Sequence, residues 1–251
     1  MENNKTYTVT KGEIRKRTII AFLLFFVFIC SAVFIWKWVF KQPEDMGTAK
    51  PLRRGLNADE VFFSSFLSPD HLAKTFPVTA AVHHPRVNGD DGMGANFNPA
   101  QWKLHLVRSP GDSILITLDE IKALPKTEII FDFKCIEGWS QVTHWGGVKF
   151  SDFANKYGLS DQVKMKYASL VTPDSGYYVG IDMASMMHPQ TMLCYEVNGE
   201  PLPLKNGFPL RLIIPVKYGI KNLKRIGRIS FSNERPPDYW YERGYDYYSG
   251  L

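Results

Sequence analysis

A single cysteine stands where a strand is expected to end. In the stretch FDFKCIEGWSQVTHWGGV, residues 131–148, Cys135 follows an alternating apolar run and precedes a bend rich in glycine and tryptophan. A thiolate there can serve as a nucleophile, a redox thiol or a ligand for a soft metal. The sequence shows neither a partner histidine with an orienting group nor a second nearby cysteine. On the residues alone, a buried structural thiol is the simplest interpretation, because free cysteine is among the most buried residue types.

A second group of candidate residues lies in NGFPLRLIIPVKYGIKNLKRIGRISF, residues 206–231. Arg211 lies on a predicted strand, and five cations follow it: Lys217, Lys221, Lys224, Arg225 and Arg228. Lysine charges and backbone N–H groups just past a strand end can hold a phosphate or a pyrophosphate. A solvated basic face is the alternative interpretation, as for other runs of positive charge.

The elements that must position these residues are mostly strands. Short apolar runs alternate with Gly, Pro and Asn, which is typical of strands: QWKLHLV, SILITL, EIIFDFKCI, ASLVT, TMLCYEV, LRLIIPV and RIGRISF. Two brief helices are predicted, one in SDFANKYG with Ser151 as N-cap and Gly158 as its stop, and one in DMASMM. Gly146 and Gly147 are expected in a loop that passes close to a bulky ligand. The sum is an α+β domain dominated by strands.

The N-terminal part of the chain is of another kind. From Thr18 to Trp36 no side chain is charged, over a length that matches the about 20 residues a helix needs to cross a bilayer. Basic residues precede this run and tryptophans follow it, so an uncleaved anchor with a cytoplasmic N-terminus is expected. The predicted organisation is a basic tail at 1–17, a transmembrane anchor at 18–40, a linker at 41–60 and a folded domain at 61–251.

Composition limits the classes of function. The chain has 251 residues, of which 45% are hydrophobic, enough for one sizeable core beyond the apolar run. Cys30, Cys135 and Cys194 are too few and too scattered for a disulfide framework, and no C-x-x-C pair is present for structural zinc. Cys194 is expected as a buried free thiol. The net charge of +5 suits an anionic partner such as nucleic acid, a lipid headgroup or a phosphorylated cofactor.

Six stretches carry a resemblance to a known family: CIEGWS at 135–140, WGGVKFSDF at 145–153, KYASLVT at 166–172, MHPQTML at 187–193, NGFPLRLIIPVKYGIKNLK at 206–224 and ERPPDYW at 234–240. In this order they resemble the molybdopterin-dependent oxidoreductases of the sulfite oxidase fold, most closely the periplasmic methionine-sulfoxide reductase catalytic subunits. Gly138 replaces the alanine of the reductases' Cys-x-Glu-Ala-Trp-Ser. The Cys-Ala-Gly-Asn-Arg run of eukaryotic sulfite oxidases and nitrate reductases is absent after Cys135, so sulfite and nitrate are less expected as substrates.

The resemblance implies a molybdenum-molybdopterin cofactor whose metal takes one thiolate from the protein, beside two dithiolene sulfurs of the pterin. Cys135 occupies that position. By motif position, the cofactor contacts fall on Asn88, Thr172, Asn206 and Arg211, with a phosphate-binding loop at Asn222, Leu223 and Lys224. Glu137, Trp139 and His144 are candidates for shaping the site or hydrogen-bonding within it, with ordinary loop packing as the alternative.

The resulting hypothesis is a single-pass protein of the bacterial inner membrane, with a sulfite-oxidase-type catalytic domain on the periplasmic or extracytoplasmic side. It would transfer an oxo group at molybdenum, with reduction of a small-molecule or protein-bound S- or N-oxide favoured. Electrons would come from a membrane haem protein or another carrier, because the chain shows no haem attachment motif and no iron–sulfur cysteine set. Membrane lipid is the other expected partner, and nucleic acid is not expected. The alternative is a cofactor-free binding or assembly module of the same fold.

Overall fold

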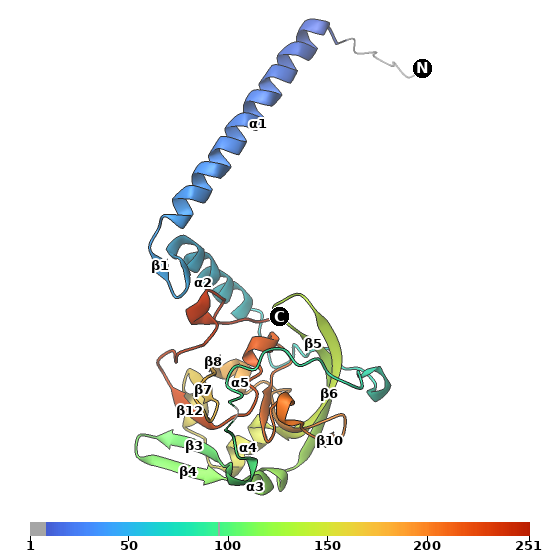
Figure 1. Ribbon diagram of the computed structural model, residues 1–251, viewed down its shortest axis with the longest axis vertical. Coiled ribbons are helices and arrows are strands. Elements are labelled where there is room, and N and C mark those ends of the chain that lie inside the picture. The colour runs from blue at the N-terminus through green and yellow to red at the C-terminus, as the bar shows by residue number, and fades with distance from the viewer. Residues whose placement is uncertain (1–8, 95) are drawn as a thin grey trace. The chain divides into compact units, whose positions relative to one another are not determined.

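The computed structural model describes residues 9–94 and 96–251, and the chain divides into two units, 1–54 and 55–251. The first unit contains α1, Lys11–Phe40, and a hairpin of β1, Glu44–Asp45, and β2, Thr48–Ala49 (Figure 1). A capping box between Thr10 and Glu13 begins α1, and none of its side chains is buried. By length and composition, α1 is suited to cross a membrane.

The segment 41–60, expected as a linker, is ordered. It contains the β1–β2 hairpin and most of α2, Lys50–Ser64. Arg53 on α2 is buried, and its guanidinium donates hydrogen bonds to the carbonyls of Asp45 and Met46. The polar composition of this segment favoured a linker, because a single arginine that satisfies hairpin carbonyls leaves no periodic pattern in the sequence.

The second unit is built on two five-stranded sheets. One has the order β10-β9-β6-β5 with β11 beside β9, and the other has the order β4-β3-β12-β7-β8. The strands of the first are β5 Lys126–Lys134, β6 Ser140–Lys149, β9 Met192–Val197, β10 Glu200–Pro201 and β11 Arg211–Ile213. The strands of the second are β3 Leu104–Ser109, β4 Asp112–Ile116, β7 Tyr167–Val171, β8 Tyr178–Asp182 and β12 Arg228–Ser232.

Helices in this unit are short. They are α3 Leu118–Lys122, α4 Phe150–Lys156 and α5 Met183–Met186, with 3-10 turns at Val78–Ala80, Pro99–Gln101, Gln162–Lys164, Leu204–Asn206, Gly219–Lys221 and Tyr241–Arg243. All seven predicted strands and both predicted helices are present, although the N-cap of α4 is Lys149 and not Ser151. The strand-dominated α+β class is confirmed.

The prediction of a loop at Gly146 and Gly147 is wrong, because both residues lie within β6. β6 pairs with β5 on one side and β9 on the other, and its register against β9 shifts between the two glycines. A Cβ atom on Gly147 would lie 2.2 Å from the carbonyl oxygen of Leu193. The two glycines therefore allow neighbouring strands to approach each other closely, and this packing accounts for them without a nearby ligand.

The main core joins both sheets. Leu106 of β3, Leu170 of β7, Leu193 of β9 and Leu212 of β11 belong to one buried cluster. A smaller cluster under β5 and β6 includes Cys194, which is fully buried and free, as predicted. The first cluster fixes the strand ends from which the site residues project.

The tyrosine-rich C-terminus packs on the second unit and holds two cations of the basic segment. Tyr247 and Tyr248 are buried. Lys221 forms a buried ion pair with Asp238, and Lys217 Nζ lies 2.8 Å from a carboxylate oxygen of Asp182 and donates to the Tyr248 carbonyl. The ammonium groups of Lys217 and Lys221 are therefore paired within the fold and do not form a phosphate site.

Replacing Tyr247 by phenylalanine should lower the free energy of unfolding by about 1 kcal/mol, because the hydroxyl donates to the Pro236 carbonyl at 3.1 Å. Urea denaturation of the full chain in detergent would measure the change. Tyr157→Phe is the matched control, since no hydrogen bond joins its hydroxyl to another of the described residues. Equal midpoints for the two variants would show that the Tyr247 hydroxyl does not help to hold the tail.

Candidate active site

Strand β5 delivers Cys135 to a cavity of about 130 Å³. Buried Ile129 and Phe131 lie on one side of the strand, and Cys135 continues their alternation at the turn that follows. The Cys135 amide donates to the Trp139 carbonyl at 2.9 Å, and the Gly138 amide donates to the Cys135 carbonyl at 3.0 Å. Gly138 has a φ of 89°, which glycine adopts without strain, so the glycine in this motif suits the turn.

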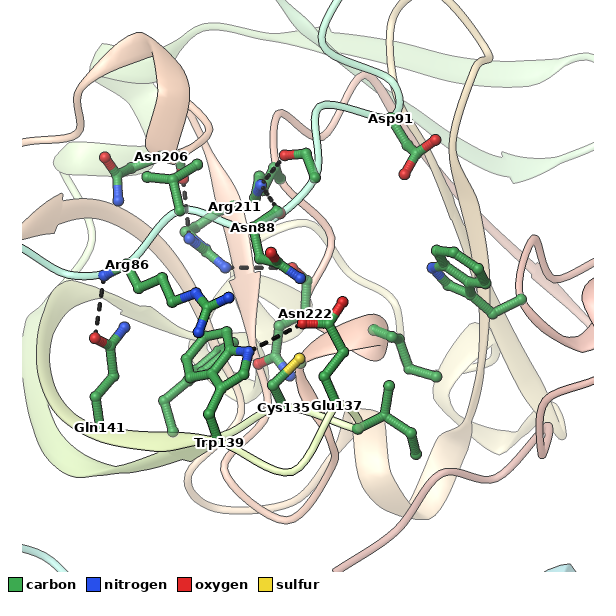
Figure 2. Close-up of a pocket in the computed structure, with 18 of the residues that line it drawn as sticks. Arg86, Asn88, Asp91, Cys135, Glu137, Trp139, Gln141, Asn206, Arg211 and Asn222 are labelled. Carbon is green, nitrogen blue, oxygen red and sulfur yellow. Dashed lines mark hydrogen bonds between the residues drawn. The ribbon is translucent and has the colours of Figure 1, made fainter.

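The Cys135 sulfur points into this cavity between Glu137 and Trp139 (Figure 2). The side chain is 8% exposed, and burial raises the pKa of its thiol. The backbone N–H of Glu137 and the charge of Arg86 act in the opposite direction and favour the thiolate. A free Cys135 is therefore protonated at neutral pH, and a bound metal would replace that proton.

Arg211 supplies a positive charge to the same cavity without a neutralising acid. It is fully buried on β11, donates to the carbonyls of Asn206 at 3.0 Å and Asn222 at 3.4 Å, and lies over the Trp145 ring. Burial lowers the pKa of Arg211 to about 10. Within residues 9–94 and 96–251, its Nε has no hydrogen-bond partner and no carboxylate lies within ion-pair distance. Such a cation needs an anion from elsewhere.

Lys224 is the second cation in the cavity wall. Its Nζ donates to the carbonyls of Asn88 and Gly89, each at 2.6 Å. Burial, with a further contribution from the charge of Arg211, lowers the pKa of Lys224 to about 8. The loop that carries Asn88 is thereby fixed against the end of the basic segment.

The structure brings six of the eight predicted site residues to one cavity: Asn88, Cys135, Asn206, Arg211, Asn222 and Lys224. Thr172 and Leu223 do not line it. The Thr172 hydroxyl donates to Asp174 at 2.7 Å beneath Gly92, where an added Cβ would lie 2.6 Å from it. Leu223 is fully buried in the core, and its carbonyl accepts from the Leu212 amide. Any role of these two residues toward a ligand remains a prediction.

The family is decided by comparison with known proteins. Residues 92–240 match the model of the oxidoreductase molybdopterin binding domain. A putative protein-methionine-sulfoxide reductase subunit, YedZ1 of Azospira oryzae, is 35% identical over 185 residues, which cover 72% of this chain and 69% of that protein. The chain belongs to the molybdopterin-binding oxidoreductases. This membership confirms the resemblance drawn from the motifs and implies a molybdopterin cofactor.

Two further known proteins match this oxidoreductase in part. The protein-methionine-sulfoxide reductase catalytic subunit MsrP of Campylobacter jejuni is 31% identical over 166 residues, 59% of this chain and 54% of that protein. The chain thus spans about half the length of MsrP. The sulfane dehydrogenase SoxCD of Paracoccus pantotrophus is 18% identical with a TM-score of 0.49, over 67% of this chain and 47% of that chain.

The residues of this molybdopterin oxidoreductase fit such a cofactor. Among the described residues, no group of three or more His, Cys, Asp or Glu side chains could hold a bare metal ion. A metal that arrives with sulfur ligands of its own needs only one protein thiolate, which Cys135 could provide. The buried, unneutralised Arg211 and the half-buried Lys224 suit the phosphate of the pterin.

Asn222 in the oxidoreductase shapes the loop and does not project freely from it. Its side-chain oxygen accepts from the Ile214 amide at 2.6 Å, and its side-chain nitrogen donates to the Tyr218 carbonyl at 3.0 Å. These bonds turn the Asn222 carbonyl toward Arg211. Backbone groups of the segment are thus held in place before a ligand binds.

Several residues in the cavity wall were not predicted: Arg86, Asp91, Gln141, Tyr177, Trp240 and Tyr245. The Arg86 guanidinium lies 4.7 Å from the centre of the Trp139 ring, and the Trp139 indole donates to Glu137 at 3.1 Å. Hydrogen bonds from Asn88 and Trp139 lower the pKa of Glu137. Arg86 stands two residues before Asn88, so alternation along that segment could have indicated it.

His144, a candidate from the motif, lies elsewhere. Its Nε2 is 3.2 Å from a carboxylate oxygen of Glu128, and the side chain does not line the cavity. β6 orients His144 and Trp145 to opposite sides, and Trp145 is the one that contacts Arg211.

Binding of the cofactor phosphate should weaken as the pH rises above about 8. The pKa of Lys224 in the cofactor-free chain is about 8, so the ammonium that would attract the phosphate is lost above that pH. Phosphate binding would raise this pKa, and proton uptake should therefore accompany binding near pH 8–9. Calorimetry in two buffers of different ionisation enthalpy would measure the uptake. Lys224→Arg should abolish it, and equal uptake in that variant would contradict the assignment to Lys224.

Proposed function

We propose that this oxidoreductase reduces a sulfoxide, with a methionine sulfoxide side chain as the favoured substrate. The observation that carries the proposal is the single cavity that contains the thiol of Cys135 and the unneutralised charge of Arg211. The names of the relatives YedZ1 and MsrP support the substrate. In the balanced reaction a sulfoxide, two electrons and two protons give a thioether and water.

The bound cofactor would supply a metal that accepts the oxo group and passes on two electrons. The chain would hold it at two ends, with Cys135 toward the metal and Arg211 and Lys224 toward the phosphate. Glu137 has a lowered pKa, so it is ionised and accepts the Trp139 indole proton in a hydrogen bond instead of donating a proton to substrate. Trp139 thereby keeps one orientation beside the sulfur, where it limits the substrate to groups that fit against an indole.

The same proposal places the protein in a bacterial inner membrane, with α1 as a single-pass anchor and the catalytic unit on the periplasmic side. The hydropathy and length of α1 support the anchor, although a signal sequence has the same properties. Electrons would come from a membrane or periplasmic carrier such as a membrane haem protein. N-terminal sequencing of the membrane-extracted protein separates an anchor, which retains Lys11, from a removed signal.

Metal and pterin analysis of the purified chain, followed by a reductase assay, tests the function. We expect one molybdenum and one pterin per chain, and oxidation of a reduced viologen when methionine sulfoxide is added. Nitrate is the control oxidant and should give no turnover. If cofactor-loaded protein does not reduce methionine sulfoxide, the proposed substrate is wrong. If the protein contains no molybdenum after expression in cells that synthesise the cofactor, the proposal that it is a molybdenum enzyme is wrong.

A further inference from the structure

The second unit exposes several large apolar side chains at the end of α2 and in the segment that follows it. Val61, Phe62, Phe63 and Phe66 are 71%, 57%, 48% and 57% exposed, and Leu72 is 53% exposed. We call these five residues the phenylalanine patch. Phe62 contacts both Phe63 and Phe66 edge to face, with ring centres 5.3 and 4.9 Å apart, so the rings cluster together. Soluble surfaces rarely expose such a cluster without a partner.

A groove of about 510 Å³ extends the patch inward. Phe62, Phe63, Phe66 and Leu72 form one part of its lining, and Phe76 and Val216 form another. Among the charged side chains of the lining, two lysines, Lys74 and Lys134, outnumber one acid, Asp132. His71 is a further titratable group there. An apolar surface with a lysine rim matches the boundary between acyl chains and anionic headgroups.

The sequence connects this patch to the apolar helix. Only residues 41–60 separate Phe40, the last residue of α1, from Val61. If α1 spans a bilayer, as proposed above, the short connection keeps the patch at a high effective concentration at the membrane surface. Weak insertion of a few aromatic side chains is then sufficient for lasting contact.

We infer that the phenylalanine patch inserts into the surface of an anionic lipid bilayer and forms a second membrane contact besides α1. Phenylalanine rings enter the boundary between headgroups and acyl chains, while Lys74 and Lys134 contact lipid phosphates. The inference rests on the proposed anchor, and it adds that the catalytic unit faces the bilayer with the phenylalanine patch.

The contact leaves the active-site cavity open to water. Asp132 and Lys134 of β5 line the groove, whereas Phe133 between them and Cys135 after them line the cavity. Because successive side chains of a strand point to opposite sides, groove and cavity lie on opposite faces of the end of β5. A bilayer that covers the groove therefore does not cover the cavity, and substrate reaches Cys135 from the aqueous side.

A nitroxide label at position 66 tests the inference in the full chain. Phe66→Cys and, as control, Leu115→Cys are made in a Cys30→Ser background, where the remaining thiols Cys135 and Cys194 are buried. Leu115 on β4 is 61% exposed and lies outside the patch. The chain is reconstituted into phosphatidylglycerol-containing nanodiscs, and collisions of each label with oxygen and with a water-soluble nickel chelate are measured.

The nickel collision rate at position 66 should be about tenfold lower than at position 115, with a high oxygen collision rate, because hydrocarbon excludes the charged chelate and dissolves oxygen. Adding Phe62→Ser and Phe63→Ser should return the label at 66 to water. A chain that enters the discs but carries a nickel-accessible label at 66 overturns the patch contact alone. A label shielded from both reagents overturns it in favour of a protein partner or a second copy, and a chain that does not enter the discs overturns the anchor as well.

Discussion

Replacing Cys135 by serine should reduce the turnover of methionine sulfoxide by at least about 10³-fold, equivalent to about 4 kcal/mol of activation free energy. The serine hydroxyl is a harder ligand with a much higher pKa than the thiol, so it is a poor replacement for a thiolate on a sulfur-rich metal. The molybdenum content of the purified variant should fall with the activity. Metal analysis and the viologen assay measure both quantities in the same preparation.

The fold should survive this substitution. Serine has nearly the shape of cysteine, the hydrogen bonds between Cys135 and Trp139 and between Gly138 and Cys135 involve only backbone atoms, and the Glu137 N–H can donate to the new hydroxyl. Cys30→Ser is the matched control, because Cys30 is an exposed thiol on α1 and its loss should change neither metal content nor turnover. A Cys135→Ser protein that keeps full molybdenum and full turnover would falsify the assigned ligand.

Much of the strand framework could be predicted from the sequence because buried strands leave short apolar runs. β5 and β9 are examples, with turn residues at their ends. β6 escaped prediction because its Gly146 and Gly147 suggest a loop, whereas the close approach of Leu193 of β9 is what demands a glycine. That constraint arises from a strand distant in sequence, so no local pattern records it.

The basic segment shows a similar limit at the site. The sequence places five cations after Arg211, and only tertiary partners distinguish them: Lys217 and Lys221 are neutralised by Asp182 and Asp238, while Lys224 lines the cavity. The acids lie outside the segment, one at the end of β8 and one in the C-terminal region. Motif position singled out Lys224, which lines the cavity, whereas charge alone could not; its contact with a phosphate remains a prediction.

Replacing Arg211 by methionine should have opposite effects on the cofactor-free chain and on cofactor loading. In the folded chain, burial lowers the pKa of Arg211 to about 10, so its charged form is penalised by folding at every pH below about 10. Methionine fills a similar volume without that penalty. After allowance for the hydrogen bonds to Asn206 and Asn222, we expect the cofactor-free variant to be more stable by about 1–2 kcal/mol.

Cofactor loading of Arg211→Met should fall at least about tenfold, because the cation proposed to contact the phosphate is gone and a phosphate contact by arginine is strong and directional. Urea denaturation of cofactor-free protein and pterin analysis of protein expressed with cofactor synthesis measure the two effects. Lys224→Met is the matched control: it removes the same charge from a half-buried site, so loading should also fall, with a smaller gain in stability. If Arg211→Met unfolds the cofactor-free chain, the guanidinium is a structural cross-link between Asn206 and Asn222; if loading is unchanged, the phosphate binds elsewhere.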